Sequence, residues 1–128
     1  MEFAYTLTTD KTMNQAVADV KERLQELQFG TLWEFNIPAK LKEKGIDYQG
    51  NATVLEVCNP SRAKEALEHN MNVVYFLPCK IVIYEEKGQT KIGMVKLTVF
   101  MDLLKDKHLK DFAQEVESTL KLAMDRAI

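Results

Sequence analysis

Two cysteines are the side chains in this sequence whose types and neighbours best suit chemistry. One lies at the start of Cys58-Asn59-Pro60 and the other at the centre of Pro78-Cys79-Lys80. Asparagine followed by proline is typical of a helix start, where the helix dipole can lower a thiol pKa and favour the thiolate. Cys58 could then be a nucleophile, and two neighbouring thiolates could hold a soft metal. This pattern gives the hypothesis of a thiol- or metal-dependent enzyme.

The same two cysteines have a simpler interpretation as core residues. Free cysteine is among the most buried residue types and packs as a small apolar side chain. The sequence has no CxxC pair, and two cysteines are too few for a structural zinc site without further ligands. We prefer this interpretation and expect no metal site. The sequence identifies neither a catalytic residue nor a cofactor.

Glu56 is the only charge in the apolar run from Val54 to Cys58. An inward-facing Glu56 would need a partner such as Lys80 or Lys96, and its pKa could be shifted. We prefer a place on the solvent side of a half-exposed strand. If the two cysteine turns meet at one end of a sheet, the candidate ligand site consists of Cys58, Asn59, Pro60, Pro78, Cys79, Glu56 and Lys80.

The other chemically capable residues form no recognised motif. His69 and His108 are the only histidines, and each lies among charged or polar residues near a predicted helix end, so we expect both at the surface. HExxH is absent, and the five glycines are too scattered for a phosphate-binding loop.

The hydrophobic pattern predicts the elements that position these residues. Strands are expected at 3–8, 31–37 and 54–58, and a hairpin is expected from 79–86 and 91–97 with Gly88 in its turn. Helices are expected from a capping box at 12–15 to about residue 28, from Pro60 to Asn70, and from Lys107 nearly to the end. We expect the segment 38–50 to be irregular or briefly helical, exposed and mobile. The segment 98–104 is ambiguous between an extended stretch and a helical turn.

These elements predict an α+β fold of two layers in a single domain, residues 1–128. A mainly antiparallel sheet is covered on one face by helices, in the order β-α-β-β-α-β-β-α with a long C-terminal helix. The class follows from layer packing, because each apolar face needs a partner.

The central pattern also resembles a known family. A strand followed by Cys-Asn-Pro, a helix, Leu-Pro-Cys and Ile-Val-Ile-Tyr-Glu is similar to the bacterial and archaeal family called domain of unknown function 302. The preceding amphipathic helix with its end at Phe29-Gly30 resembles the family too. The resemblance implies a helix, a mainly antiparallel sheet and a closing C-terminal helix, with a pocket between sheet and helix. It implies no established activity.

Composition and charge exclude several classes of partner. The chain has 128 residues, 46% of them hydrophobic, and a net charge of −2 with both signs interspersed. No basic stripe is present for nucleic-acid phosphates, and no apolar run is long enough to span a membrane. The acidic start Met1-Glu2-Phe3 lacks a signal-peptide pattern, so we expect a cytoplasmic protein with reduced thiols.

Three functions remain open. An aromatic-rich sheet, with Trp33, Phe35, Tyr75, Phe76 and Met94 as candidate lining residues, favours a module that binds an apolar or amphipathic small molecule. Excess apolar surface around Val73 to Leu77 could instead form the face of a homodimeric structural or interaction protein. The cysteine-dependent enzyme ranks third.

Overall fold

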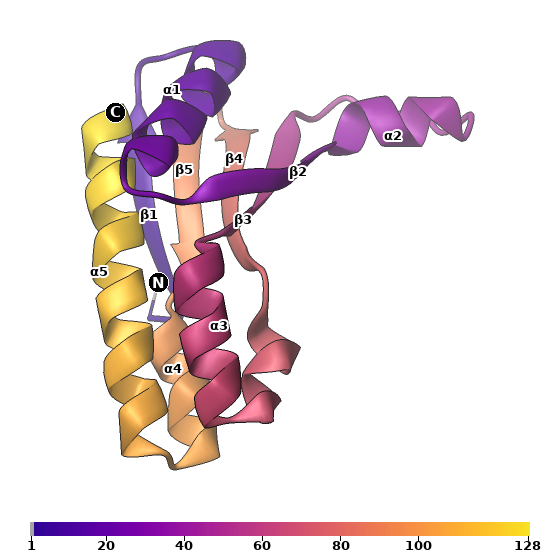
Figure 1. The fold of residues 1–128 in the computed structure, drawn as a ribbon. Coiled ribbons are helices and arrows are strands. Elements are labelled where there is room, and N and C mark those ends of the chain that lie inside the picture. Colours follow the sequence, from indigo (N-terminus) through magenta and orange to yellow (C-terminus); the bar gives the residue numbers. More distant parts are fainter. Residues whose placement is uncertain (1) are drawn as a thin grey trace.

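The computed structural model describes residues 2–128 and has a five-stranded sheet at its centre (Figure 1). All neighbouring strands are antiparallel, and the order across the sheet is β1-β5-β4-β3-β2. The strands are β1 (Ala4–Thr9), β2 (Gly30–Asn36), β3 (Ala52–Cys58), β4 (Cys79–Glu86) and β5 (Gln89–Val95). The predicted α+β class and antiparallel sheet are confirmed.

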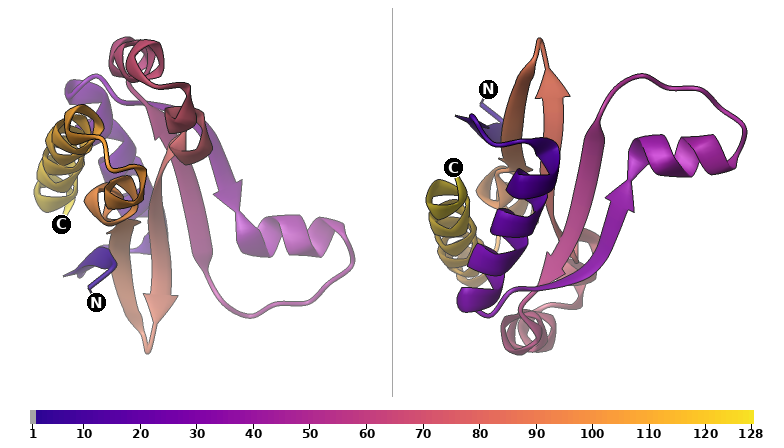
Figure 2. Two further views of the ribbon diagram at one scale, coloured as in Figure 1. Left: turned by 90° about the horizontal axis from the view of Figure 1, so that it is seen from below. Right: turned by 90° about the horizontal axis from the view of Figure 1, so that it is seen from above.

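Helices cover one face of this sheet and leave the other open (Figures 1 and 2). The long helices are α1 (Met13–Glu26), α3 (Pro60–His69) and α5 (Lys107–Ala127). Four short elements are α2 (Ile37–Glu43), α4 (Leu97–Met101) and the 3₁₀ helices η1 (Met71–Phe76) and η2 (Asp102–Leu104). Without the short elements, the predicted order β-α-β-β-α-β-β-α is confirmed. Within the described range, no helix is long and apolar enough to cross a membrane.

The main core lies between the sheet and the pair α1 and α5. Successive strand residues point to opposite faces, so Leu55, Ile81 and Ile92 are fully buried on the helical side. Their neighbours Glu56 and Lys80 point to the open face. The helices contribute apolar side chains at helical spacing, such as the fully buried Leu24 and Met124.

A second apolar cluster lies beyond the lower end of the sheet, where α3, η1, α4 and the start of α5 meet. Its buried members are Ala66, Val73, Met101, Leu109 and Ala113. Most of the apolar run Val73–Leu77 lies in the 3₁₀ helix η1, and Val73 is buried in this cluster.

The connection between β2 and β3 projects from the body as an arm, which we define as residues 37–51 (Figure 2). The Asn36 side chain accepts a hydrogen bond from the Ala39 N–H at 3.1 Å and so begins α2. No residue of α2 is buried. The exposure of this segment was predicted, and of its two predicted forms, irregular or briefly helical, the brief helix is the one observed.

Candidate ligand-binding site

β4 and β5 form a fork at the lower end of the sheet. They pair from the hairpin turn only as far as Val82 and Gly93. Below this point β4 continues beside β3 to Cys79, whereas β5 continues beside β1 to Val95. Backbone N–H and C=O groups on the inner sides of the fork lie outside the β4–β5 ladder, where a ligand or water can satisfy them.

A hollow of about 450 Å³ opens in this fork, which we call the fork hollow. Its walls are mainly apolar, and Glu56 and Lys80 are its two charged lining residues. The apolar walls come from η1, from the Leu77–Cys79 segment, from the end of β5, from α4 and from α5: Tyr75, Phe76, Leu77, Pro78, Cys79, Val95, Leu97, Phe100 and Leu120. An apolar concavity with a few polar groups is what a small-molecule site requires.

The aromatic wall of the fork hollow depends on a buried carboxylate. Phe100 lies on α4, and its ring centroid is 6.4 Å from that of Phe76. The start of α4 has no capping side chain of its own. Instead Glu117 of α5, only 7% exposed, accepts hydrogen bonds from the Thr98 N–H and hydroxyl, both at 3.2 Å. Glu117 thereby holds the first turn of α4, as an N-cap residue would.

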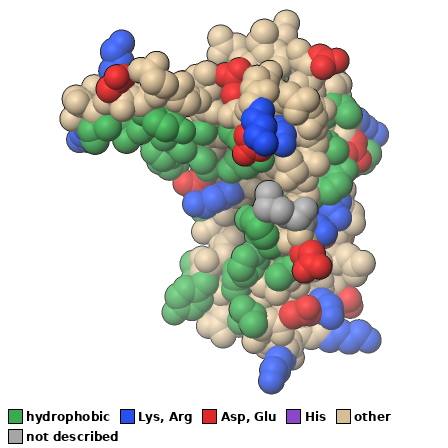
Figure 3. All heavy atoms as spheres, turned by 180° about the vertical axis from the view of Figure 1, so that it is seen from behind, with side chains coloured by type: hydrophobic (Ala, Val, Ile, Leu, Met, Phe, Trp, Pro, Cys, Tyr) green, Lys and Arg blue, Asp and Glu red, His purple; other side chains and the backbone are tan. Residues whose placement is uncertain are grey.

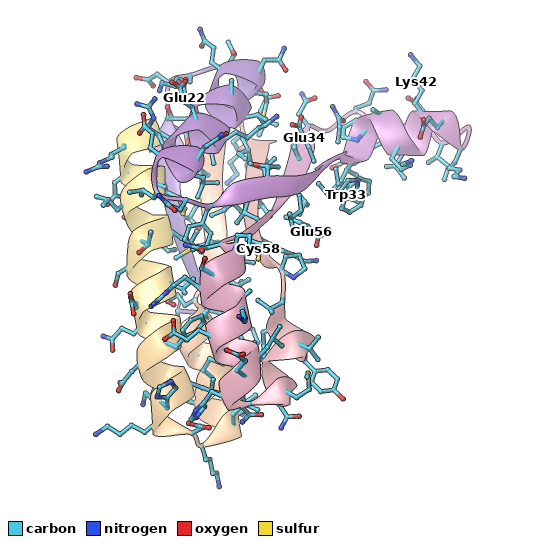
Figure 4. All side chains as sticks on the ribbon, viewed as in Figure 1. Glu22, Trp33, Glu34, Lys42, Glu56 and Cys58 are labelled. Carbon is cyan, nitrogen blue, oxygen red and sulfur yellow. The ribbon has the colours of Figure 1, made fainter. Side chains whose placement is uncertain are left out.

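Glu56 and Lys80 lie in a row that runs across the open face. Trp33 of β2 is opposite Glu56 of β3, and Glu56 is opposite Lys80 of β4. Figure 4 shows Trp33 and Glu56 close together at the root of the arm. The Trp33 ring also stacks on Phe35, with centroids 4.9 Å apart. The solvent-side position predicted for Glu56 agrees with this row.

The two cysteines border a different and much smaller space. Cys58, Asn59 and Cys79 line an apolar cavity of about 30 Å³ beneath α3, together with Arg62 and Phe112. Such a volume is enough for only about two or three water molecules. This cysteine cavity has no room for a larger ligand without a rearrangement of its walls.

Burial raises the pKa of both thiols. The pKa of Cys58 is raised by desolvation, and that of Cys79 is raised to about 11 by desolvation and then by the nearby Cys58. The Asn59 side chain does cap α3, accepting from the Arg62 N–H at 3.3 Å. Desolvation nevertheless dominates, so both groups are neutral thiols near pH 7, the weaker form for nucleophilic attack or metal binding.

The seven residues of the candidate site are thus divided between two hollows. Cys58 and Asn59 line the cysteine cavity, whereas Glu56, Pro78 and Lys80 line the fork hollow. Cys79 borders both, and Pro60 borders neither. Of the candidate aromatic lining, Tyr75 and Phe76 face the fork hollow, Trp33 and Phe35 lie elsewhere on the open face, and Met94 is a core residue.

A histidine cluster at the other end of α3 was not visible in the sequence. His69 and His108 are exposed as predicted, but their rings stack at 3.9 Å, and His69 Nε2 is 3.2 Å from Asp106. Asp106 caps α5 by accepting from the N–H groups of His108 and Leu109. The bond from Leu109 lowers the pKa of Asp106 most, and the Asn70 and His69 side chains lower it further. Nowhere in residues 2–128 do three or more His, Cys, Asp or Glu side chains form a metal-binding group.

Comparisons with known proteins found one family model and a solved structure that match this chain. The model of the family described as "Domain of unknown function DUF302" matches residues 5–127. The chain belongs to the DUF302 family. The crystal structure of an uncharacterized conserved DUF302 protein from Bacillus stearothermophilus is similar over 100% of both chains, with 41% sequence identity and a TM-score of 0.94. No curated protein matches the chain.

DUF302 membership supports the architecture and leaves the activity open. The resemblance at Cys-Asn-Pro and Leu-Pro-Cys is therefore confirmed as a family resemblance. The family's own description states no ligand, reaction or partner. The function of this DUF302 chain has to be argued from its hollows and surfaces.

Proposed function

We propose that this DUF302 protein is a binding module for an apolar or amphipathic small molecule, and that the fork hollow is the site. The observation that carries the proposal is the hollow of about 450 Å³, within the range of roughly 300 to 1,000 Å³ that is usual for ligand pockets. The cysteine cavity, at about 30 Å³, is more than ten times smaller. Two further hollows, at the arm and beside η2, are of similar volume but have more polar linings.

The chemistry of the walls suggests how such a ligand would lie. Its apolar part would contact Phe76 and Phe100, whose rings pack against each other and line the hollow. An anionic group would be attracted to the Lys80 ammonium, and a donor group would be attracted to Glu56. Open fork-side backbone groups offer further hydrogen bonds.

A cysteine-dependent enzyme is a weaker candidate, because burial raises the pKa of both thiols. A homodimeric interaction protein is the second candidate. It is favoured by the exposed apolar side chains on the open face, among them Trp33 at 49% and Tyr75 at 82% exposure.

The test is a fluorescence titration with the amphipathic anionic probe anilinonaphthalene sulfonate. We expect saturable binding to the folded protein, weakened about tenfold by Phe100→Ala, since an aromatic wall is worth at least about 1.4 kcal/mol. Leu103→Ala is the matched control, because Leu103 is 75% exposed on the adjoining turn and does not line the hollow. Equal affinity of both variants and the native protein would refute the site, provided that circular dichroism shows all three folded.

A further inference from the structure

The open face carries a row of groups that is complementary to itself when reversed. From β2 to β5 the row contains the exposed Trp33 ring, the Glu56 carboxylate, the Lys80 ammonium and then the fork hollow. In this direction the row presents an exposed ring, a negative charge, a positive charge and a hollow. A second copy turned by a half rotation presents the same groups in reverse order. The exposed ring then meets the hollow, and the negative charge meets the positive charge.

We propose that the open sheet face docks a second copy of this chain, about a two-fold axis that runs between β3 and β4, parallel to the strands. Glu56 of each copy then lies over Lys80 of the other. An axis perpendicular to the strands in the same face would instead place like charges together, and like-charge contacts at an interface are costly. The charges therefore select the axis, and the strands of the two sheets stay aligned, as in packed sheets.

In the part of the chain that the structure describes, neither of these two charges is held in a close ion pair. Neither Glu56 nor Lys80 forms an ion pair within 4.0 Å or a side-chain hydrogen bond with any residue of 2–128. Glu56 is half-buried and Lys80 is exposed, so both can reach a partner. Two reciprocal ion pairs at the centre would fix the register of the two faces.

The apolar groups of the same face are placed on either side of the charges. Figure 3 shows hydrophobic side chains along the lower edge of the arm and again on the body below it, with charged side chains between them. Under the proposed rotation, Trp33 of each copy lies against the fork hollow of the other. The arm, whose Ile46 and Tyr48 are 53% and 50% exposed, extends past the second copy's β5 and β1.

In this arrangement the second copy contributes a residue to the proposed ligand site, and this part of the inference rests on the proposed function. Trp33 from the second copy becomes the roof of the fork hollow. The indole is held in place by its stack on Phe35, with an interplanar angle of 8°. A ligand would then be enclosed between two subunits rather than held on one.

Charge reversal tests the docking without any ligand. In sedimentation equilibrium we expect the native protein to be a dimer, and Glu56→Lys or Lys80→Glu alone to weaken self-association at least about 100-fold through two like-charge contacts. An equal mixture of the two variants should restore a dimer, and so should the double variant E56K/K80E. Glu68→Lys, the same charge change on the exposed side of α3, is the control and should stay dimeric.

Trp33 provides a local readout, because it is the only tryptophan of the chain. We expect its emission to shift to the blue with increasing native protein concentration, and to stay constant for Glu56→Lys. A native protein that is monomeric at high micromolar concentration, or a mixture of the two variants that stays monomeric while both are folded, overturns the proposal. A dimer that binds no probe would refute only the proposed function, whereas a monomer that binds probe would refute only the docking.

Discussion

At the scale of single residues, the two cysteines behave as core side chains rather than reagents. Their position at the ends of β3 and β4 follows from the chain's alternation and from the two prolines beside them. The sequence could not predict how far each sulfur is removed from water. The helix dipole predicted a lowered pKa for Cys58, but the apolar surroundings under α3 raise it.

The raised pKa of Cys79 leads us to expect that the free energy of unfolding depends on pH. Its ordinary thiol pKa of 9.0 is raised to about 11 in the folded protein, so between these values the unfolded chain releases a proton that the folded chain keeps. The stability from this thiol is fully present below pH 9 and is lost as the pH rises through 11. The loss is about 2 to 3 kcal/mol for two units.

The measurement is urea unfolding at several values between pH 8 and pH 11. The native protein should lose more stability over this range than Cys79→Ala, since the variant lacks the titrating thiol. Cys58→Ala should retain most of the native slope, because desolvation is the first cause of the shift at Cys79. Parallel curves for the native protein and Cys79→Ala would contradict the assigned pKa.

At the scale of elements, caps and alternation were predictable because they depend on near neighbours. The Thr12–Gln15 capping box, the Asn59 cap and the hairpin of β4 and β5 all appear as the sequence indicated. The fork was not predictable, because it depends on where two ladders part, and no local pattern encodes that register. The role of Glu117 was hidden for the same reason: Thr98 is distant in sequence.

We expect the buried Glu117 cap of α4 to affect both stability and binding at the fork hollow. Glu117→Ala leaves the Thr98 N–H and hydroxyl without their acceptor, so we expect a loss of about 1 to 3 kcal/mol in unfolding free energy. Because α4 carries Phe100, probe affinity should fall as well. Glu117→Gln keeps an acceptor oxygen and is expected to retain most of both. Chemical denaturation and probe titration of the two variants, side by side, decide the matter; equal behaviour of both with the native protein would exclude the cap.

At the scale of the whole molecule, one sheet face is used for the core and the other is left open. The helices α1 and α5 bury the first, while the second carries the fork hollow and the row from Trp33 to Lys80. Layer packing predicted the covered face from the apolar stripes of the helices. It could not predict the arm, because residues 37–51 have little apolar periodicity and α2 buries none of its side chains.

The central claim, that the fork hollow is the ligand site, is tested most directly by methyl NMR during titration with anilinonaphthalene sulfonate. The account predicts the largest shifts at methyl groups that line the fork hollow, those of Leu77, Val95, Leu97 and Leu120, with Ala63 and Val116 of the cysteine cavity less affected. Leu77 and Leu97 border both spaces, so Val95 against Ala63 is the deciding pair. Shifts centred on Ala63, or no saturable shift at Val95, would contradict the account.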